Sequence, residues 1–166
     1  MDNSMIGKIQ KAKRYAAEPE RIAFHSLSVD FKGSNNEYVT TLGPDGWHCT
    51  CPGFQKYAIC PHIMTLERIL GVMLKRQRLP YANGQNVVSD VEKATQYSKE
   101  IDRLKFTSFE VTVHGEHSDH IVTYQDGEWE CNNEYFRTHK ICSHVMVMER
   151  LLSSMVTRMT MVKATD

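Results

Sequence analysis

Apolar and polar residues follow two different spacings along this chain, and the two spacings succeed one another in the same order twice. From Ile6 to Ala16, apolar residues recur at steps of three and four, which predicts a helix over about residues 4–17. From Leu27 to Phe31, apolar and polar residues alternate one by one, which is typical of a strand with one buried face. The chain therefore begins with a helix and continues into a strand.

Two further strands and a second helix are expected after the first strand. The segment Tyr38–Leu42 favours a strand, and the Gly- and Pro-containing stretch from Gly43 to Gly46 indicates the turn that follows it. A short third strand then carries Trp47. A closing helix is predicted to begin near Pro61, because a proline in the first helical turn loses no hydrogen bond, and to run to about Arg78.

The second half of the chain repeats the first. When the sequence is shifted so that Cys49 falls on Cys131, it overlays itself without a gap. Self-similarity at a fixed spacing indicates two copies of one structural unit. Matched residues include Tyr15 and Tyr97, Glu18 and Glu100, Arg21 and Arg103, Phe24 and Phe106, Trp47 and Trp129, Phe54 and Phe136, and Ile59 and Ile141.

The repeat predicts the elements of the second copy. A helix is expected over about 89–103, opened by a capping box that starts at Ser89. Strands are expected at Phe109–Val113 and His120–Tyr124, followed by a short third strand. The closing helix should begin near Ser143 and reach nearly to the C-terminus.

These elements define the expected fold class and its domains. We expect an α+β fold made by tandem duplication of a helix–strand–strand–strand–helix (αβββα) unit. The first unit covers residues 1–78, a linker covers 79–88 and the second unit covers 89–166. The two units are expected to share one core and to be related by a pseudo-twofold axis or by simple repetition.

Cysteine usage and hydropathy indicate the class of protein. The chain has an odd number of cysteines, five, and they gather in two clusters, which fits metal binding in a reducing compartment better than a disulfide framework. No apolar run is long enough for a membrane span, and none is expected. The stretch Met1–Ser4 has neither the charge nor the apolar core of a secretory signal. We therefore expect a cytoplasmic protein.

The first cysteine cluster has the composition of a structural zinc site. Cys49, Cys51, Cys60 and His62 follow the spacing C-x-C-x8-C-x-H. Alternate residues of a strand face the same way, so the first two sulfurs can point together, and Cys60 can precede a helix whose first turn carries His62. Three thiolates and one imidazole fill a tetrahedral Zn²⁺ shell, which leaves no open position for catalysis.

The second cluster keeps only part of this frame. Cys131, Cys142 and His144 recur, but Asn133 stands in the place of the second cysteine, and a neutral amide is a poor zinc ligand. His139 in the intervening loop is a candidate substitute, and a three-ligand site completed by water is another alternative. We favour an empty or weakly binding frame, so one zinc ion is expected and a second is left open.

The first cluster and its flanks resemble the SWIM-type zinc finger family. The resemblance rests on Cys49-Thr-Cys51, the eight-residue gap, and Cys60-Pro-His62 at a helix start, and it covers about residues 37–70. Residues 119–152 look like a degenerate copy, and the duplicated unit is similar to bacterial SWIM-containing proteins. The resemblance implies a ββα zinc finger in each unit and binding to DNA, to protein or to both, and it implies no enzyme.

Charge is distributed unevenly between the halves. Residues 1–83 carry a net charge of +4 and residues 84–166 carry −4. Basic residues on the first helix, in the metal loop and at the end of the closing helix form the candidate nucleic-acid contacts, together with a tyrosine that can stack on bases. These candidates are Lys8, Lys11, Lys13, Arg14, Lys56, Tyr57, Lys75, Arg76 and Arg78.

Three functional hypotheses follow. The first is a zinc-stabilised binding protein, with no enzymatic activity, that contacts nucleic acid through the first copy and protein through the second. The alternative is a scaffold or homodimeric subunit with no nucleic-acid role, favoured by the Met-rich last helix (Met146, Met148, Met155, Met159, Met161) as an adaptable partner surface. The third, a metalloenzyme at Cys131, Cys142 and His144, is the least favoured. Neither a membrane nor a small-molecule substrate is expected, and His114, His117 and His120 are interpreted as loop histidines.

Overall fold

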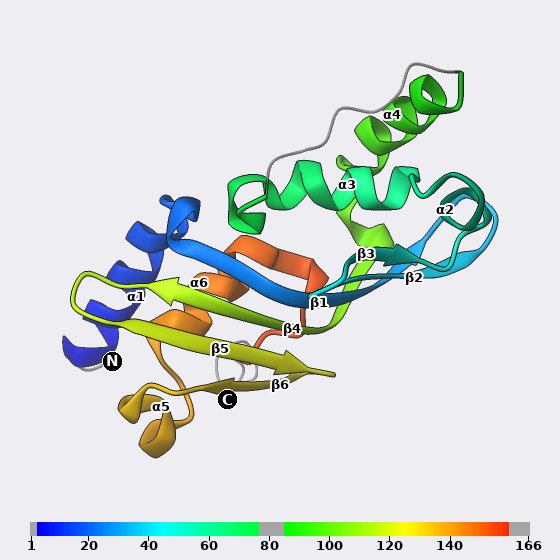
Figure 1. Cartoon of the computed structure of the whole chain (residues 1–166). Coiled ribbons are helices and arrows are strands. Elements are labelled where there is room, and N and C mark those ends of the chain that lie inside the picture. The colour runs from blue at the N-terminus through cyan, green and yellow to red at the C-terminus, as the bar shows by residue number, and fades with distance from the viewer. Residues whose placement is uncertain (1–2, 77–84, 160–166) are drawn as a thin grey trace.

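The computed structural model describes residues 3–76 and 85–159 and has a mixed α+β fold. Six antiparallel strands form one sheet in the order β3-β2-β1-β4-β5-β6 (Figure 1). The strands are β1 (Ile22–Lys32), β2 (Glu37–Gly43), β3 (Gly46–Cys49), β4 (Leu104–His114), β5 (Asp119–Gln125) and β6 (Glu128–Cys131). The helices are α1 (Asn3–Ala16), α2 (Pro52–Tyr57), α3 (Pro61–Leu70), α4 (Gln85–Tyr97), α5 (Glu134–His139) and α6 (Ser143–Leu152). Short 3-10 turns are η1 (Pro19–Arg21), η2 (Gly71–Leu74), η3 (Ile101–Arg103) and η4 (Ser153–Met155).

The two halves of the chain have the same order of elements at the same spacing. Strands β4, β5 and β6 and helices α5 and α6 have the lengths of β1, β2, β3, α2 and α3, and each follows its counterpart by the interval that separates Cys49 from Cys131. Equal spacing follows from the sequence pattern, because each matched apolar residue returns to the same position in its strand or helix. Positions related by this interval can therefore be compared directly.

The halves meet at the centre of the sheet, where β1 pairs with β4. Leu27 lies opposite Phe109, its own counterpart in the second half. On either side the pairing is reciprocal, because Ile22 lies opposite Val113 and Phe31 opposite Leu104. This register is that of an approximate twofold axis passing beside Leu27 and Phe109.

One hydrophobic core joins the two halves. Apolar side chains of β1 and β4 alternate between buried and more exposed positions, as the period of two predicts. The buried cluster continues from Leu27 and Phe109 into the closing helices, through Leu66 of α3 and Val145 of α6. The expectation of a shared core is therefore confirmed.

Each opening helix packs against the closing helix of the other half. Helix α1 lies on α6, and α4 lies on α3, as Figure 1 shows. The same contacts recur in both directions: Glu116 N–H donates to Tyr15 Oη at 3.1 Å, and Ser34 Oγ lies 2.6 Å from Tyr97 Oη. These hydrogen bonds place the start of each half beside a turn of the other half.

The helix ends differ from the sequence expectations. Helix α3 ends at Leu70, not Arg78, because Gly71 has φ +51° and leaves the helical conformation. Helix α6 ends at Leu152, far from the C-terminus, and Ser153 has φ +52° at the matched position. Helix α4 begins at Gln85, inside the predicted linker 79–88. The domain boundaries themselves stay a prediction.

Two short helices, α2 and α5, complete the fold. The sequence patterns did not predict α2 and α5, helices of six residues each that lie in the gap between Cys51 and Cys60 and in the matched gap between Asn133 and Cys142. Such helices are too short to show a periodic pattern. Within residues 3–76 and 85–159, no helix is both long and apolar enough to cross a membrane.

Candidate metal centre

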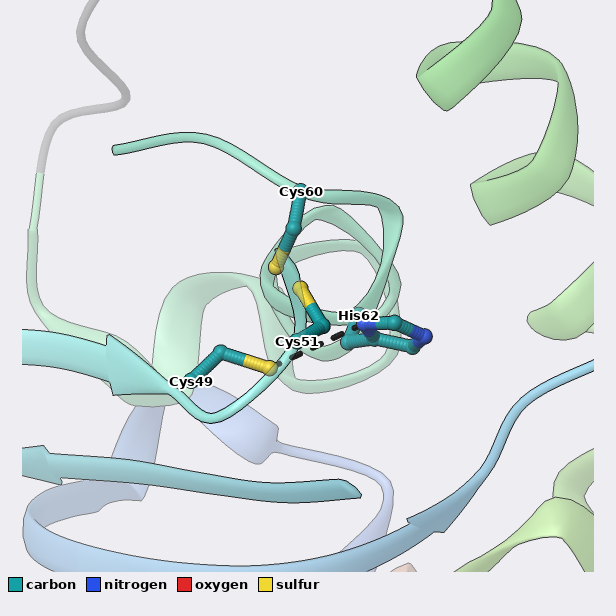
Figure 2. Close-up of side chains that lie close together, drawn as sticks. All are labelled: Cys49, Cys51, Cys60 and His62. Carbon is teal, nitrogen blue, oxygen red and sulfur yellow. Dashed lines mark hydrogen bonds between the residues drawn. The ribbon is translucent and has the colours of Figure 1, made fainter. Parts of the chain in front are cut away.

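The four predicted ligands of the first cluster come together at the edge of the sheet. Cys49 ends β3, Cys51 caps α2, Cys60 caps α3 and His62 lies in the first turn of α3. All four side chains are buried, and one donor atom from each lies within 4.8 Å of the others (Figure 2). The chemistry of the set, three sulfurs and an imidazole nitrogen, is that of a closed tetrahedral zinc site.

Hydrogen bonds to the sulfurs prepare this cluster for a cation. The N–H of Phe54 donates to Cys51 Sγ at 3.4 Å, and the N–H of Ile63 donates to Cys60 Sγ at 3.4 Å. Both donors are free because the first N–H groups of a helix have no partner within the helix. Helix starts with unpaired N–H groups favour the thiolate over the thiol.

Thr40 is a supporting residue that sequence reasoning missed. Its hydroxyl donates to Cys49 Sγ at 3.3 Å, and it is fully buried on β2. The register of the hairpin places Thr40 opposite Cys49, so a correct strand pairing is the signal that finds it. Val122 takes the matched position opposite Cys131 and offers no such hydrogen bond.

The three sulfurs compete for negative charge in the absence of a cation. The hydrogen bond from the Cys60 thiol, supported by His62 and Thr40, lowers the pKa of Cys49 to about 3. The same hydrogen bond together with burial raises the pKa of Cys60 far above its usual range, and burial raises the pKa of Cys51. A bound Zn²⁺ ion would stabilise all three as thiolates.

Aromatic rings fix the orientation of His62. Its Nδ1 lies 3.7 Å from Cys49 Sγ, on the side where the ion would bind. The ring packs against Phe31 and Tyr38 with centroids 4.7 and 4.9 Å away, and Tyr97 of α4 stacks on it at 6.1 Å. These contacts bring residues from both halves of the chain around one ligand.

The second cluster brings together three of its candidate ligands. Cys131, Cys142 and His144 are buried, and their donor atoms lie within 4.8 Å of one another. The two clusters are thus two candidate zinc sites. Here too, a hydrogen bond between the two thiols makes their pKa values differ. The hydrogen bond from Cys131 lowers the pKa of Cys142 to about 5, and the same bond together with burial raises the pKa of Cys131.

Asn133 and His139 do not complete the second cluster. Asn133 Oδ1 accepts a hydrogen bond from the N–H of Phe136 at 3.2 Å and so caps α5, as Cys51 caps α2. His139 is exposed at the end of α5, and its ring stacks on Tyr135 with centroids 3.9 Å apart. The structure therefore places His139 outside the cluster for which it was a candidate fourth ligand.

His120 is the neighbour that sequence reasoning overlooked. It was interpreted as a loop histidine at the start of the predicted strand His120–Tyr124. It lies within β5, and its ring centroid is 4.3 Å from that of His144. Burial, assisted by His144, lowers the pKa of His120. Its position matches that of Tyr38 in the first half, so the repeat itself is the signal that identifies it.

The candidate nucleic-acid contacts do not form one surface. Helix α1, which carries Lys8, Lys11, Lys13 and Arg14, and helix α2, which carries Lys56 and Tyr57, lie at opposite ends of the sheet (Figure 1). Several of these cations have partners.

Arg14 pairs with Glu116 at 2.7 Å, Lys8 lies 3.7 Å from the ring centroid of Tyr135, and Lys75 donates to the carbonyl of Glu20. Lys56 and Tyr57 are exposed beside the first cluster. Arg76 is also exposed, and Arg78 lies outside the described residues.

The Met-rich helix is part of the core. Met146 and Met148 of α6 and Met155 of η4 are buried within the cluster that joins the two halves. The expectation of an adaptable partner surface on this helix is therefore wrong for these three side chains. Met159 is partly buried against the same cluster, and Met161 lies outside the described residues. The helix is apolar, as the pattern predicted. Its apolar side chains are buried within the chain because α1 and the sheet cover them.

Comparisons with known proteins agree with the geometry of the first cluster. No curated protein and no solved structure matches the chain. The family model described as SWIM zinc finger matches residues 38–71, the segment that runs from β2 through all four ligands to the end of α3. In this segment the chain is similar to the SWIM zinc finger family, and its buried cysteine–histidine cluster is consistent with zinc binding.

Proposed function

We propose that the protein is a zinc-stabilised binding protein that contacts nucleic acid beside its first metal cluster and has no enzymatic activity of its own. SWIM zinc fingers are associated with zinc-dependent binding, commonly to nucleic acid or protein. A first cluster with four protein ligands has no coordination position for a substrate, which favours a structural role for the metal. The expected setting is the cytoplasm, where the free thiols stay reduced.

The observation that carries this proposal is the exposed end of α2. Lys56 and Tyr57 lie side by side there, with the Lys56 Nζ 5.3 Å from the centroid of the Tyr57 ring, and the Tyr57 side chain is 49% exposed. Helix α2 follows Cys51 directly, so bound zinc holds its position. A cation beside an exposed aromatic face matches the two features of a nucleic acid, phosphate charge and base surface.

We also propose that the chain is a tandem duplication of an αβββα unit. Support comes from the constant interval between matched elements and from the reciprocal register of β1 and β4. On this proposal, each unit contributes one cluster, and the second is a degenerate version of the first.

Fluorescence anisotropy with labelled single- and double-stranded oligonucleotides tests the binding proposal. We expect binding that weakens between about 50 and 200 mM salt, because phosphate contacts release counterions. Combined Lys56→Gln and Tyr57→Ala substitution should weaken it by about tenfold or more, the scale of one lost base stack. The matched control changes Thr138 and His139 to alanine at the same positions of α5 and should leave binding unchanged. Equal loss in the control, or no binding to any oligonucleotide at low salt, overturns the proposal.

The alternative is a scaffold or homodimeric subunit. Val88 and Val91 of α4 are 60% and 39% exposed, which gives a protein partner an apolar contact area. Light scattering across a range of concentrations distinguishes the two, because a homodimer shows twice the mass of the chain and a monomeric nucleic-acid-binding protein does not.

A further inference from the structure

The second cluster differs from the first at one corner of its tetrahedron. In the first half, Cys51 has two roles, since its sulfur caps α2 and is also a candidate ligand. In the second half, Asn133 keeps the capping role through Oδ1 but contributes no sulfur. Cys131, Cys142 and His144 are therefore held by the same arrangement of strand and helices, with three donors in place of four.

A cavity of about 400 Å³ opens beside this corner. Asn133, Cys142 and His144 contribute to its wall from the cluster, and Lys8 and Lys11 contribute from α1 of the other half. A cavity of this size holds a small molecule or one side chain of a binding partner.

The charges around the two clusters differ. Helix α4 of the second half, which packs on α3 beside the first cluster, carries Asp90 and Lys93 at the positions that match Lys8 and Lys11. Three thiolates with Zn²⁺ give the first site a net charge of −1, whereas two thiolates with Zn²⁺ give the second site no net charge. A neutral metal site beside two lysines can accept an anion, and the first site cannot.

His144 provides a second observation at this site. The side chain is 2% exposed, and its Nε2 is buried without a hydrogen-bond partner among residues 3–76 and 85–159. Such an atom is costly to bury. Nδ1 of the same ring faces the cluster, 4.0 Å from Cys131 Sγ, so Nε2 is left for a polar ligand in the adjoining cavity that His144 helps to line.

We propose that Cys131, Cys142 and His144 hold a zinc ion whose fourth coordination position takes a carboxylate from outside the chain, with Lys8 and Lys11 binding its second oxygen. A carboxylate suits this corner because one oxygen can ligate Zn²⁺ while the other accepts a hydrogen bond from a lysine. The Lys8 ammonium lies 3.2 Å from Ser4 Oγ and over the ring of Tyr135, and all three residues line the same cavity. The carboxylate belongs either to a small molecule or to a side chain of a partner protein. This inference is independent of nucleic-acid binding.

Cobalt loading of the full chain tests the proposal, because Co²⁺ reports its ligands through visible absorption. We expect two Co²⁺ ions per chain. Titration with sodium acetate should change the bands of one ion and leave the other unchanged. A blocked peptide with a single glutamate, compared with its glutamine version, distinguishes the two sources: a response at much lower concentration than acetate identifies a protein side chain, and an equal response identifies a small carboxylate.

Three variants make the test specific. Cys142→Ser should remove one ion together with the acetate response. Asn133→Cys should keep two ions, retain the cap of α5 and abolish the acetate response, because the fourth position is then filled by sulfur. Combined Lys8→Gln and Lys11→Gln should keep two ions and weaken acetate binding roughly tenfold.

Two results would overturn the proposal. One is a single ion per chain in wild type, with Cys142 reactive toward thiol reagents. The other is an acetate response that is absent from wild type or that persists in Asn133→Cys.

Discussion

The two cysteine clusters share one backbone arrangement and differ in how they are held together. The first has four donors, and its neighbours Trp47, Phe54 and Ile59 are only partly buried. The second has three donors, and the matched residues are all buried. These are Trp129, Phe136 and Ile141. The comparison indicates that metal ligation and apolar burial substitute for each other in stabilising the same loop.

The ends of the two halves show the same contrast. Trp129 Nε1 donates to the carbonyl of Thr157 at 2.9 Å, so the chain after α6 covers its tryptophan. In the first half, Trp47 lines a cavity of about 610 Å³ together with Leu74 and Arg76 of the segment after α3. The half with fewer donors is therefore the half with the more complete apolar packing.

The largest effect should come from metal removal. A strong chelator should destabilise the protein by on the order of 10 kcal/mol at the first cluster, the scale of structural zinc sites. Urea unfolding followed by circular dichroism with and without chelator measures this. Cys142→Ala should keep most of the chelator effect and Cys60→Ala should lose it. The reverse order would show that the second cluster depends on metal more than the first does, which contradicts the difference between them.

Removing an aromatic side chain should affect the second half more. Phe136 is 1% exposed, so Phe136→Ala should lower the free energy of unfolding by about 3–5 kcal/mol. Phe54 is partly exposed, so Phe54→Ala should cost roughly half as much when zinc is bound. Chemical denaturation of both variants at saturating zinc compares the two, and equal losses would argue against the exchange of ligation for burial.

A smaller difference is expected between the tryptophans. Trp129→Phe removes the hydrogen bond to Thr157, so it should cost about 1 kcal/mol more than Trp47→Phe. Acrylamide should also quench the fluorescence of Trp47, measured in Trp129→Phe, more strongly than that of Trp129, measured in Trp47→Phe. Similar quenching in both variants would show that the two tryptophans are equally covered.

An effect of similar size concerns Thr40, and it acts on zinc affinity. Thr40→Val copies Val122 of the second half and removes the hydrogen bond to Cys49 Sγ, so the affinity of the first site for zinc should fall by about tenfold. Competition with a chromogenic chelator measures this affinity. The companion variant Thr40→Ser keeps the hydroxyl and should stay near wild type; if both variants lose affinity equally, packing and not the hydrogen bond explains the effect.

Much of the secondary structure followed from local patterns. The alternation at Leu27–Phe31 and the cysteine spacing predicted strands and helix starts close to those observed, because burial at periods of two and 3.6 is a local property. The ends of α3 and α6 could not be predicted in this way. Gly71 and Ser153 have positive φ angles and end the helices, although the apolar pattern continues beyond them.

The arrangement of the two halves and the residues around the ligands could not be predicted from the sequence. Pairing of β1 with β4, and packing of α1 on α6, depend on which of several compatible apolar faces meet, and periodicity does not distinguish them. The four donors of the first cluster were predictable because their spacing is short. Thr40 and His120 were not found, because they reach the clusters through strand register, and His139 points elsewhere because sequence proximity does not fix direction.

The central claim is that the first cluster is a zinc site closed by four protein ligands. X-ray absorption spectroscopy of the zinc-loaded Cys142→Ala variant, which isolates this site, tests it most directly. The account predicts three sulfur neighbours at about 2.3 Å and one nitrogen at about 2.0–2.1 Å. Fewer than three sulfurs, or an added oxygen ligand in place of the imidazole, would contradict it.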